Sequence, residues 1–298
     1  MRDLHCHILP GVDDGSPNME YSLRMLDAAK KAGVTSIICT PHCRSPYFNY
    51  EKMMAAYESF KAAADGFPVY MGFEVNHTKL LELGISTWAP YLGFEQTGQF
   101  LLELNTACTE ASFDEYERTI YRLQGMGYRV IIAHPERYDA IRKDVSLAER
   151  LVDLGCDLQA SADFIKGGRL GNSKRTAKKL FKMGLYRYIA SDAHKVEHYE
   201  MLAKARELYG LKGSHFALYT DTSGIAAPEI VHQRRDSNPW ETAHRTETDS
   251  AVTMTRGQRE WSGPKLCARR RASISSRKSQ RTISVPPRVL RRCSLSME

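Results

Sequence analysis

Two histidines near the start of the chain, His5 and His7, constrain its fold most strongly, because they alternate with apolar residues in a stretch that predicts a β-strand. Alternate side chains share one face of a strand, so the two imidazoles lie side by side. An acidic turn containing Asp13 and Asp14 follows. Imidazole and carboxylate ligands together suit a transition metal. An isolated His-x-His pair is more often structural, so this interpretation depends on the rest of the chain.

The composition fits a folded protein of one barrel-sized domain or two smaller ones, with 298 residues, 42% of them hydrophobic and 26% charged. No apolar run reaches the roughly 18 residues of a membrane span. No signal-peptide pattern precedes the first strand, so we expect a cytoplasmic protein. Cys6, Cys39 and Cys156 lie in or beside apolar runs, which predicts reduced, buried thiols rather than a disulfide framework.

The net charge of +7 belongs to the C-terminal segment alone. Residues 1–232 contain 27 Lys and Arg against 29 Asp and Glu, whereas residues 233–298 contain 15 against 6. The second segment is rich in Arg and Ser and has no helical or strand periodicity, which predicts a disordered tail after a folded domain of residues 1–232. A basic arm can bind nucleic acid. Nothing in residues 1–232 is typical of a nucleic-acid-binding protein, so we favour a solvated extension.

Apolar strand-like runs alternate with helical patterns up to about residue 210. After the strand around His5, the predicted strands cover residues 36–42, 68–75, 99–104, 128–134, 156–161 and 186–194. The first helix is expected to begin at Ser16 and Pro17, and the later ones cover residues 50–65, 113–127, 147–155, 173–184 and 199–209. This alternation predicts a parallel sheet covered on both faces, and a closed barrel is the simplest arrangement of about seven such units.

Active sites of such barrels lie at the C-terminal ends of the strands. The metal-type residues of this chain occupy those positions: His5, His7, His42, Glu74, Glu103, His134, Asp192 and His194. Asp13 or Asp14 adds a carboxylate on the first turn. Six strands therefore each direct a ligand to one end of the barrel, and this coincidence favours a metal site over unrelated structural residues.

At these residues the chain resembles the PHP (polymerase and histidinol phosphatase) superfamily, and within it the bacterial tyrosine phosphatases that act on capsular and exopolysaccharide tyrosine kinases. The matching segments are Asp3 to Gly15, Thr40 to His42, Gly72 to Val75, Leu102 to Leu104, Ala133 to Tyr138 and Ala190 to His194. They follow the family's order and spacing over roughly residues 1–210. As a set they are far more specific than His-x-His alone.

The resemblance implies a distorted TIM-like (β/α)7 barrel that holds three divalent metal ions. Manganese is expected, with iron, cobalt and zinc as alternatives. The implied ligand sets are His5, His7, Glu74 and Asp192 for one ion, Glu74, Glu103 and His134 for the second, and Asp14, His42 and His194 for the third. Asp13 is the alternative to Asp14.

The implied reaction is metal-dependent hydrolysis of phosphomonoesters, with phosphotyrosine on a capsule or exopolysaccharide tyrosine kinase as the expected substrate. Three divalent ions and four carboxylates leave an excess charge of about +2, which fits a phosphomonoester dianion. Arg137 and His42 are the candidate catalytic residues, since the guanidinium fork of Arg137 can bind two phosphoryl oxygens. The family often carries a second arginine after its Asp-x-His motif. This chain has Lys195 and His198 in that region.

Three other functions compete with this hypothesis. A cysteine-based tyrosine phosphatase needs an arginine six residues after its nucleophile, and none of the seven cysteines has one. Histidinol-phosphate hydrolysis or nuclease activity would use the same metal ligands, and the Glu136-Arg137-Tyr138 motif favours the tyrosine phosphatase branch over both. A non-catalytic binding module would predict a degenerate site, whereas every expected ligand is present.

Overall fold

Parallel strands alternate with helices in the computed structural model, which describes residues 1–168 and 171–210. The strands are β1 (Arg2–Cys6), β2 (Ser36–Cys39), β3 (His42–Cys43), β4 (Val69–Met71), β5 (Glu74–Asn76), β6 (Gln99–Glu103), β7 (Arg129–Ala133), β8 (Asp157–Ser161) and β9 (Tyr186–Ala190). The α-helices are α1 (Met19–Lys31), α2 (Tyr50–Ala63), α3 (His77–Leu83), α4 (Ile85–Leu92), α5 (Phe113–Gly125), α6 (Asp139–Lys143), α7 (Ser146–Asp153), α8 (Ser173–Lys182) and α9 (His198–Ala205). The expected tail and the domain boundary at residue 232 lie outside the described residues.

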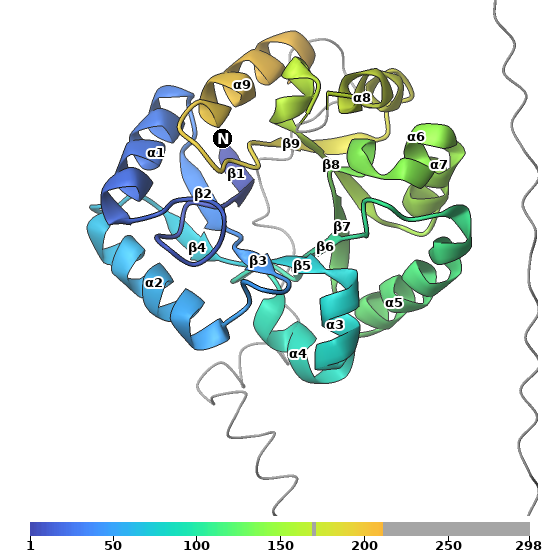
Figure 1. Cartoon of the computed structure of the whole chain (residues 1–298), viewed down its shortest axis with the longest axis horizontal. Coiled ribbons are helices and arrows are strands. Elements are labelled where there is room, and N and C mark those ends of the chain that lie inside the picture. Colours follow the sequence, from blue (N-terminus) through green and yellow to red (C-terminus); the bar gives the residue numbers. More distant parts are fainter. Residues whose placement is uncertain (169–170, 211–298) are drawn as a thin grey trace, which may run out of the picture. The chain divides into compact units, whose positions relative to one another are not determined.

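The strands form a ring with helices around its outside (Figure 1). One sheet has the order β1-β2-β4 and the other the order β3-β5-β6-β7-β8-β9, with every pair parallel. Only two residues separate β2 from β3, and only two separate β4 from β5, so each of these pairs forms one interrupted strand. The nine described strands therefore occupy seven positions around the ring. A parallel bridge between Cys6 and Ala193 joins the two ends of the series. The predicted α/β barrel is therefore confirmed.

Alternation along the strands divides the apolar core into two parts. Leu101 and Ile131 belong to a cluster made almost entirely of strand residues, which fills the interior of the ring. Phe100 and Val130 belong to the larger cluster between the strands and the helices. Glu103 lies two residues beyond Leu101 and therefore faces the same side. The interior apolar layer thus supports polar side chains at the C-terminal end of the ring.

Two of the predicted strands are interrupted where candidate ligands begin. Pro41 has no N–H group and separates β2 from β3, and Gly72 lies in the break between β4 and β5. A Cβ atom at Gly72 would lie 2.5 Å from the ring of Phe94, so only glycine fits there. His42 and Glu74 consequently begin the second segment of each strand and are direct partners in the β3–β5 register.

The helix boundaries differ from the prediction at the first helix. Helix α1 begins at Met19, and its N-cap is Asn18, whose side chain accepts a hydrogen bond from the N–H of Tyr21 at 2.9 Å. The helix was expected to begin at Ser16 and Pro17, but Ser16 lies before α1, and its N–H donates to the carbonyl of His7 at 3.0 Å. That bond folds the acidic turn back against the end of β1.

The structure also bears on the expectations about membrane spans and thiols. Within residues 1–168 and 171–210, none of the helices combines the length and the apolar character needed to cross a bilayer. Cys6, Cys39 and Cys156 are buried and free, as predicted.

Candidate metal centre

All nine predicted metal ligands lie together at the C-terminal end of the ring. They come from β1 and the turn after it (His5, His7, Asp14), from β3, β5 and β6 (His42, Glu74, Glu103), and from the ends of β7 and β9 (His134, Asp192, His194). The structure groups their ligand atoms into overlapping sets of three or four that lie within 4.8 Å of one another. His5 and His194, which lie 189 positions apart in the chain, thus share one site.

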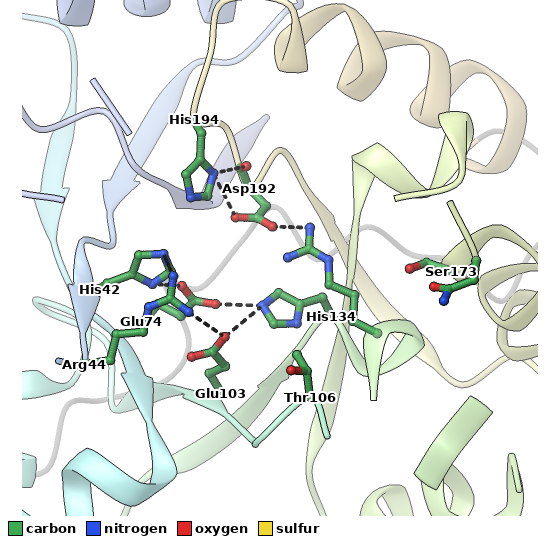
Figure 2. A pocket seen from close by; sticks show the side chains of 11 residues that line it. His42, Arg44, Glu74, Glu103, Thr106, His134, Ser173, Asp192 and His194 are labelled. Carbon is green, nitrogen blue, oxygen red and sulfur yellow. Dashed lines mark hydrogen bonds and ion pairs between the residues drawn. The ribbon is translucent and has the colours of Figure 1, made fainter. Parts of the chain in front are cut away.

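Glu74 lies at the middle of this arrangement (Figure 2). Its Oε1 atom is 2.7 Å from Nε2 of His134, and its Oε2 atom is 2.6 Å from Nδ1 of His42. Glu103 Oε1 lies 3.9 Å from Nε2 of the same His134. Glu74, Glu103 and His134 are therefore adjacent, as the resemblance implied, and His42 is also within reach of this set.

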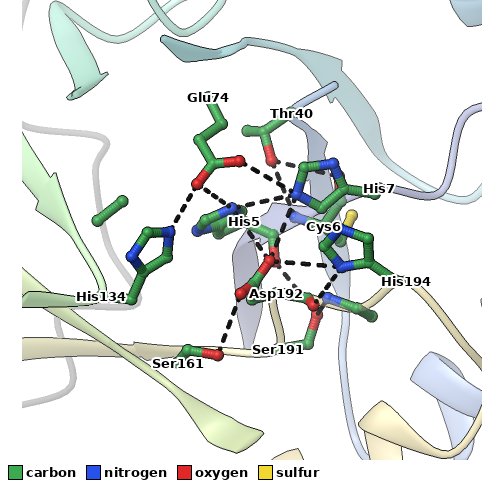
Figure 3. A network of polar contacts seen from close by, with 12 residues as sticks. His5, Cys6, His7, Thr40, Glu74, His134, Ser161, Ser191, Asp192 and His194 are labelled. Atoms are coloured by element: carbon green, nitrogen blue, oxygen red, sulfur yellow. Dashed lines mark hydrogen bonds and ion pairs between the residues drawn. The ribbon is translucent and has the colours of Figure 1, made fainter. Parts of the chain in front are cut away.

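The deepest set consists of His5, His7, Glu74 and Asp192, which come from β1 and the residues after it, from β5 and from the end of β9 (Figure 3). The Nε2 atoms of His5 and His7 lie 3.3 Å apart. Each of these nitrogens is 3.4 Å from Asp192 Oδ1 and 3.4 Å from one oxygen of Glu74. All four side chains are buried, so their charges must be balanced inside the protein. A cation bound among these four side chains would balance the negative charge of Glu74 and Asp192.

A third set lies nearer the solvent. Asp14 Oδ1 is 3.1 Å from Nε2 of His42 and 3.3 Å from Nε2 of His194. The ring of His194 stacks on that of His7, with centroids 4.0 Å apart, so this set adjoins the deepest one. Within the described residues, the buried atoms Glu74 Oε2 and His194 Nε2 make no hydrogen bond of good geometry. A donor set of nitrogen and oxygen atoms turned inward without hydrogen bonds fits bound transition-metal ions.

The geometry distinguishes Asp13 from Asp14. Asp13 Oδ2 accepts hydrogen bonds from His7 Nδ1 at 2.8 Å and from the N–H of His42 at 3.1 Å. Its carboxylate is thus directed at the outer nitrogen of His7, and only the Nε2 atom of that ring faces the centre. Asp14 has the position of a ligand, and Asp13 that of a residue that orients one.

A glutamine performs the same task for His5. Gln159 Oε1 accepts a hydrogen bond from His5 Nδ1 at 2.9 Å, while the Gln159 amide group donates to the carbonyl of Ala160 at 2.8 Å. Since the amide orientation is defined by the second bond, His5 is held with its Nε2 lone pair toward the centre. Such partners commonly tune the metal affinity of a histidine.

The electrostatics of the centre favour bound positive charge. Burial would lower the pKa of His5, but the Glu74 and Asp192 carboxylates outweigh burial and raise that pKa above its ordinary 6.5. Burial would raise the pKa of Asp192, but Arg137 and His5 hold it well below its usual range. A raised pKa for His5 beside a lowered pKa for Asp192 shows that this part of the centre favours positive charge.

Two of the ligands have strained backbones. His134 has φ 31° and Asp192 has φ 48°, in the left-handed region that costs a non-glycine residue about 1–2 kcal/mol. The N–H of Asp192 donates to the carbonyl of His5 at 2.8 Å, and the N–H of Arg137 donates to the carbonyl of His134 at 3.0 Å. These bonds hold the strained residues in place, as is common at functional sites.

Arg137 lies beside the deepest set, on the 3-10 turn Pro135–Arg137. Its Nη2 group donates to Asp192 Oδ2 at 2.5 Å, to Asp163 Oδ2 at 3.0 Å and to Ser161 Oγ at 2.9 Å. The guanidinium is therefore anchored through one nitrogen on both a candidate ligand and a carboxylate outside the ligand set.

The centre opens into a cavity of about 180 Å³. Arg137 and six of the nine candidate ligands line it, together with four residues that the sequence did not single out: Arg44, Thr106, Asn172 and Ser173. Arg44 follows His42 by two positions, so strand alternation was a usable signal for it. The other three come from loops or from the start of α8, where sequence spacing carries no such information.

The part of the chain that carries these residues is similar to known proteins. Residues 1–209 match the model of the family described as capsular polysaccharide synthesis, CpsB/CapC. The chain belongs to this family. All nine candidate ligands lie within the matched residues.

Curated relatives of the CpsB/CapC family are named as phosphatases. The chain is 31% identical over 210 residues to the putative tyrosine-protein phosphatase CapC of Staphylococcus aureus, covering 68% of this chain and 81% of that protein. It is 30% identical over 207 residues to the tyrosine-protein phosphatase YwqE of Bacillus subtilis, covering 66% and 78%. A crystal structure from work on YwqE and Streptococcus pneumoniae CpsB, described as unique metal-dependent tyrosine phosphatases, superposes with a TM-score of 0.60 at 28% identity, covering 72% of this chain and 88% of that one.

We predict that Gln159→Leu weakens metal binding by about tenfold to a hundredfold, because His5 loses the acceptor that orients its ring. Equilibrium titration of the metal-free protein with Mn²⁺ or Zn²⁺ measures the effect. The matched control is Gln124→Leu, since Gln124 also donates a side-chain hydrogen bond, to the Leu154 carbonyl at 2.7 Å, and lies outside the candidate site. If Gln159→Leu bound the metal as tightly as Gln124→Leu does, a role for Gln159 in the metal centre would be excluded.

Proposed function

We propose that this chain hydrolyses phosphotyrosine on a protein in a metal-dependent reaction. The observation that carries the proposal is the convergence of five histidines and four carboxylates at one end of the barrel, beside a cavity that an anchored guanidinium lines. The names of the CpsB/CapC relatives support it. The closest competing activity is hydrolysis of another phosphomonoester, such as histidinol phosphate, or of a nucleic acid, at the same centre.

We further propose three divalent ions, manganese first and iron, cobalt or zinc as alternatives. His5, His7, Glu74 and Asp192 would hold one ion, Glu74, Glu103 and His134 a second, and Asp14, His42 and His194 a third. Support comes from the short distances within each set and from the mixture of imidazole and carboxylate donors, which suits these metals better than magnesium.

The protein residues then bind and orient the phosphate. Divalent ions held by these residues would supply a water nucleophile of lowered pKa and would neutralise charge on the phosphoryl oxygens. Arg137 directs the remainder of its fork to the phosphate, while Asp163 and Ser161 prevent it from moving. His42 lines the same cavity, so we assign it a catalytic contact with the phosphoryl group as well as a ligand role.

A neighbouring hollow offers room for the rest of the substrate. It measures about 370 Å³ and shares Arg137, Asp192 and His194 with the catalytic cavity. Lys166, Lys195, His198 and Met201 lie on its other sides. We propose that the phosphorylated protein is a tyrosine kinase of capsule or exopolysaccharide synthesis and that the reaction takes place in the cytoplasm, where the buried free thiols would remain reduced.

The test is a substrate comparison with metal-loaded protein. We expect a phosphotyrosine peptide to be hydrolysed with kcat on the order of 1–10³ s⁻¹, and the same peptide with phosphoserine, histidinol phosphate and single-stranded DNA to be poorer substrates. Phosphate release and metal content are measured on the same samples. Efficient hydrolysis of histidinol phosphate or DNA with the phosphotyrosine peptide left intact would replace the proposal with the competing activity.

A further inference from the structure

Arg44 is placed to act on whatever enters the catalytic cavity. It lies two residues after His42, directly beyond strand β3, so both side chains face the same side of the ring. Figure 2 shows its guanidinium beside His42 and Glu103 at the cavity. Its side chain is 29% exposed, and its guanidinium carbon lies 5.7 Å from the centre of the Tyr47 ring. Arg44 therefore occupies the solvent side of the centre.

Within residues 1–168 and 171–210, the polar partners of this guanidinium all belong to the candidate ligand set. Its Nη2 group donates to His42 Nε2 at 2.9 Å and lies 3.7 Å from Asp14 Oδ2. Its Nη1 group lies 3.8 Å from Glu103 Oε1. Arg137 differs in this respect, because Asp163 anchors it independently of the ligands.

This difference matters once cations occupy the centre. A histidine nitrogen that gives its lone pair to a metal ion can no longer accept a hydrogen bond from a guanidinium, and a carboxylate whose charge is balanced by a cation attracts a guanidinium less. Arginine cannot give up its proton. Arg44 would then stand beside positive charge with its donors turned to the cavity. A phosphate dianion is the ligand that satisfies such a group, since the planar fork matches two of its oxygens.

We propose that Arg44 is a substrate-binding residue that contacts the phosphate from the β3 side of the cavity, while Arg137 contacts it from the β7 side. This inference rests on the proposed function, because it assigns the second guanidinium of the same site. It adds a residue that distinguishes phosphate from neutral ligands and that changes partners between the metal-free and the loaded protein.

The experiment measures phosphate binding rather than turnover. Inorganic phosphate is titrated calorimetrically into the metal-loaded protein, and the metal content of each sample is determined in parallel. We expect Arg44→Ala to weaken phosphate binding by about tenfold to a hundredfold with unchanged metal content. Arg44→Lys keeps the charge without the fork and should fall between the two. The control Arg142→Ala removes an arginine of similar exposure, 27%, that pairs with Asp139 on α6, and should bind phosphate like the wild type.

Each alternative result is decisive. Equal phosphate affinity in wild type and Arg44→Ala would overturn the proposal, as would a metal-loaded wild type that binds no phosphate. Loss of metal from both Arg44 variants would show that Arg44 supports the ligands instead. If phosphate binding depends on Arg44 but no phosphotyrosine peptide is hydrolysed, the proposed function fails and the assignment of Arg44 stands.

Discussion

Glu74→Gln should lower the turnover of a phosphotyrosine peptide by about a thousandfold or more, because this one carboxylate contributes to two of the three proposed ion sites. Its two oxygens lie within 3.4 Å of nitrogens of His5, His7, His42 and His134. The amide preserves the shape of the side chain, removes its charge and replaces one acceptor by a donor. We expect metal content to fall together with turnover, and His5→Ala to behave in the same way.

The matched control is Cys43→Ser, one residue after a proposed ligand. Cys43 is buried and free, and burial raises the pKa of its thiol, so it has no thiolate to offer as a nucleophile. Turnover should stay within about twofold of the wild type. A Cys43→Ser protein that retains its metal and loses its activity would overturn a mechanism based on a metal-activated water.

The positions of the ligands were predictable because a parallel barrel directs the C-terminal ends of its strands to one side. Glu103 illustrates the reason. It follows Leu101 by two residues, so both side chains point to the same face of β6. Leu101 packs in the interior of the ring, and Glu103 therefore lies on that face one step closer to the C-terminal end of the strand. On β1 the parity differs, because Leu4 belongs to the interior cluster and the β1–β2 register shifts between Asp3 and Cys6. Residue type and strand position together were enough to predict that these candidate ligands lie together.

Features that depend on contacts between distant residues could not be predicted. The two carboxylates Asp13 and Asp14 are adjacent in sequence, and their roles are separated by the hydrogen bonds that Asp13 accepts from His7 Nδ1 and from the N–H of His42. Gln159 alternates with two other polar residues of β8, Asp157 and Ser161, and nothing in its spacing links it to His5. Helices α3 and α4 were missed because they are short and α4 contains Pro90, which sequence patterns associate with a helix end.

Complete removal of metal should abolish hydrolysis of the phosphotyrosine peptide and not merely reduce it. Without cations, the four carboxylates Asp14, Glu74, Glu103 and Asp192 would face an approaching phosphate dianion, and like charges in a partly buried cavity repel strongly. Activity is measured after exhaustive chelation and again after removal of the chelator and addition of metal. Hydrolysis that survives verified loss of metal would exclude the proposed mechanism.

The metal that restores activity tests the ligand assignment separately. Five of the nine proposed ligands are imidazoles, which suit manganese, iron, cobalt and zinc, whereas magnesium prefers oxygen ligands and retains its waters. We therefore expect Mn²⁺ to restore turnover and Mg²⁺ at the same concentration to restore at most a small fraction. Full activity with Mg²⁺ would mean that the histidines do not bind the catalytic ions and that the carboxylates hold them alone. The comparison thus separates the identity of the ligands from the requirement for metal itself.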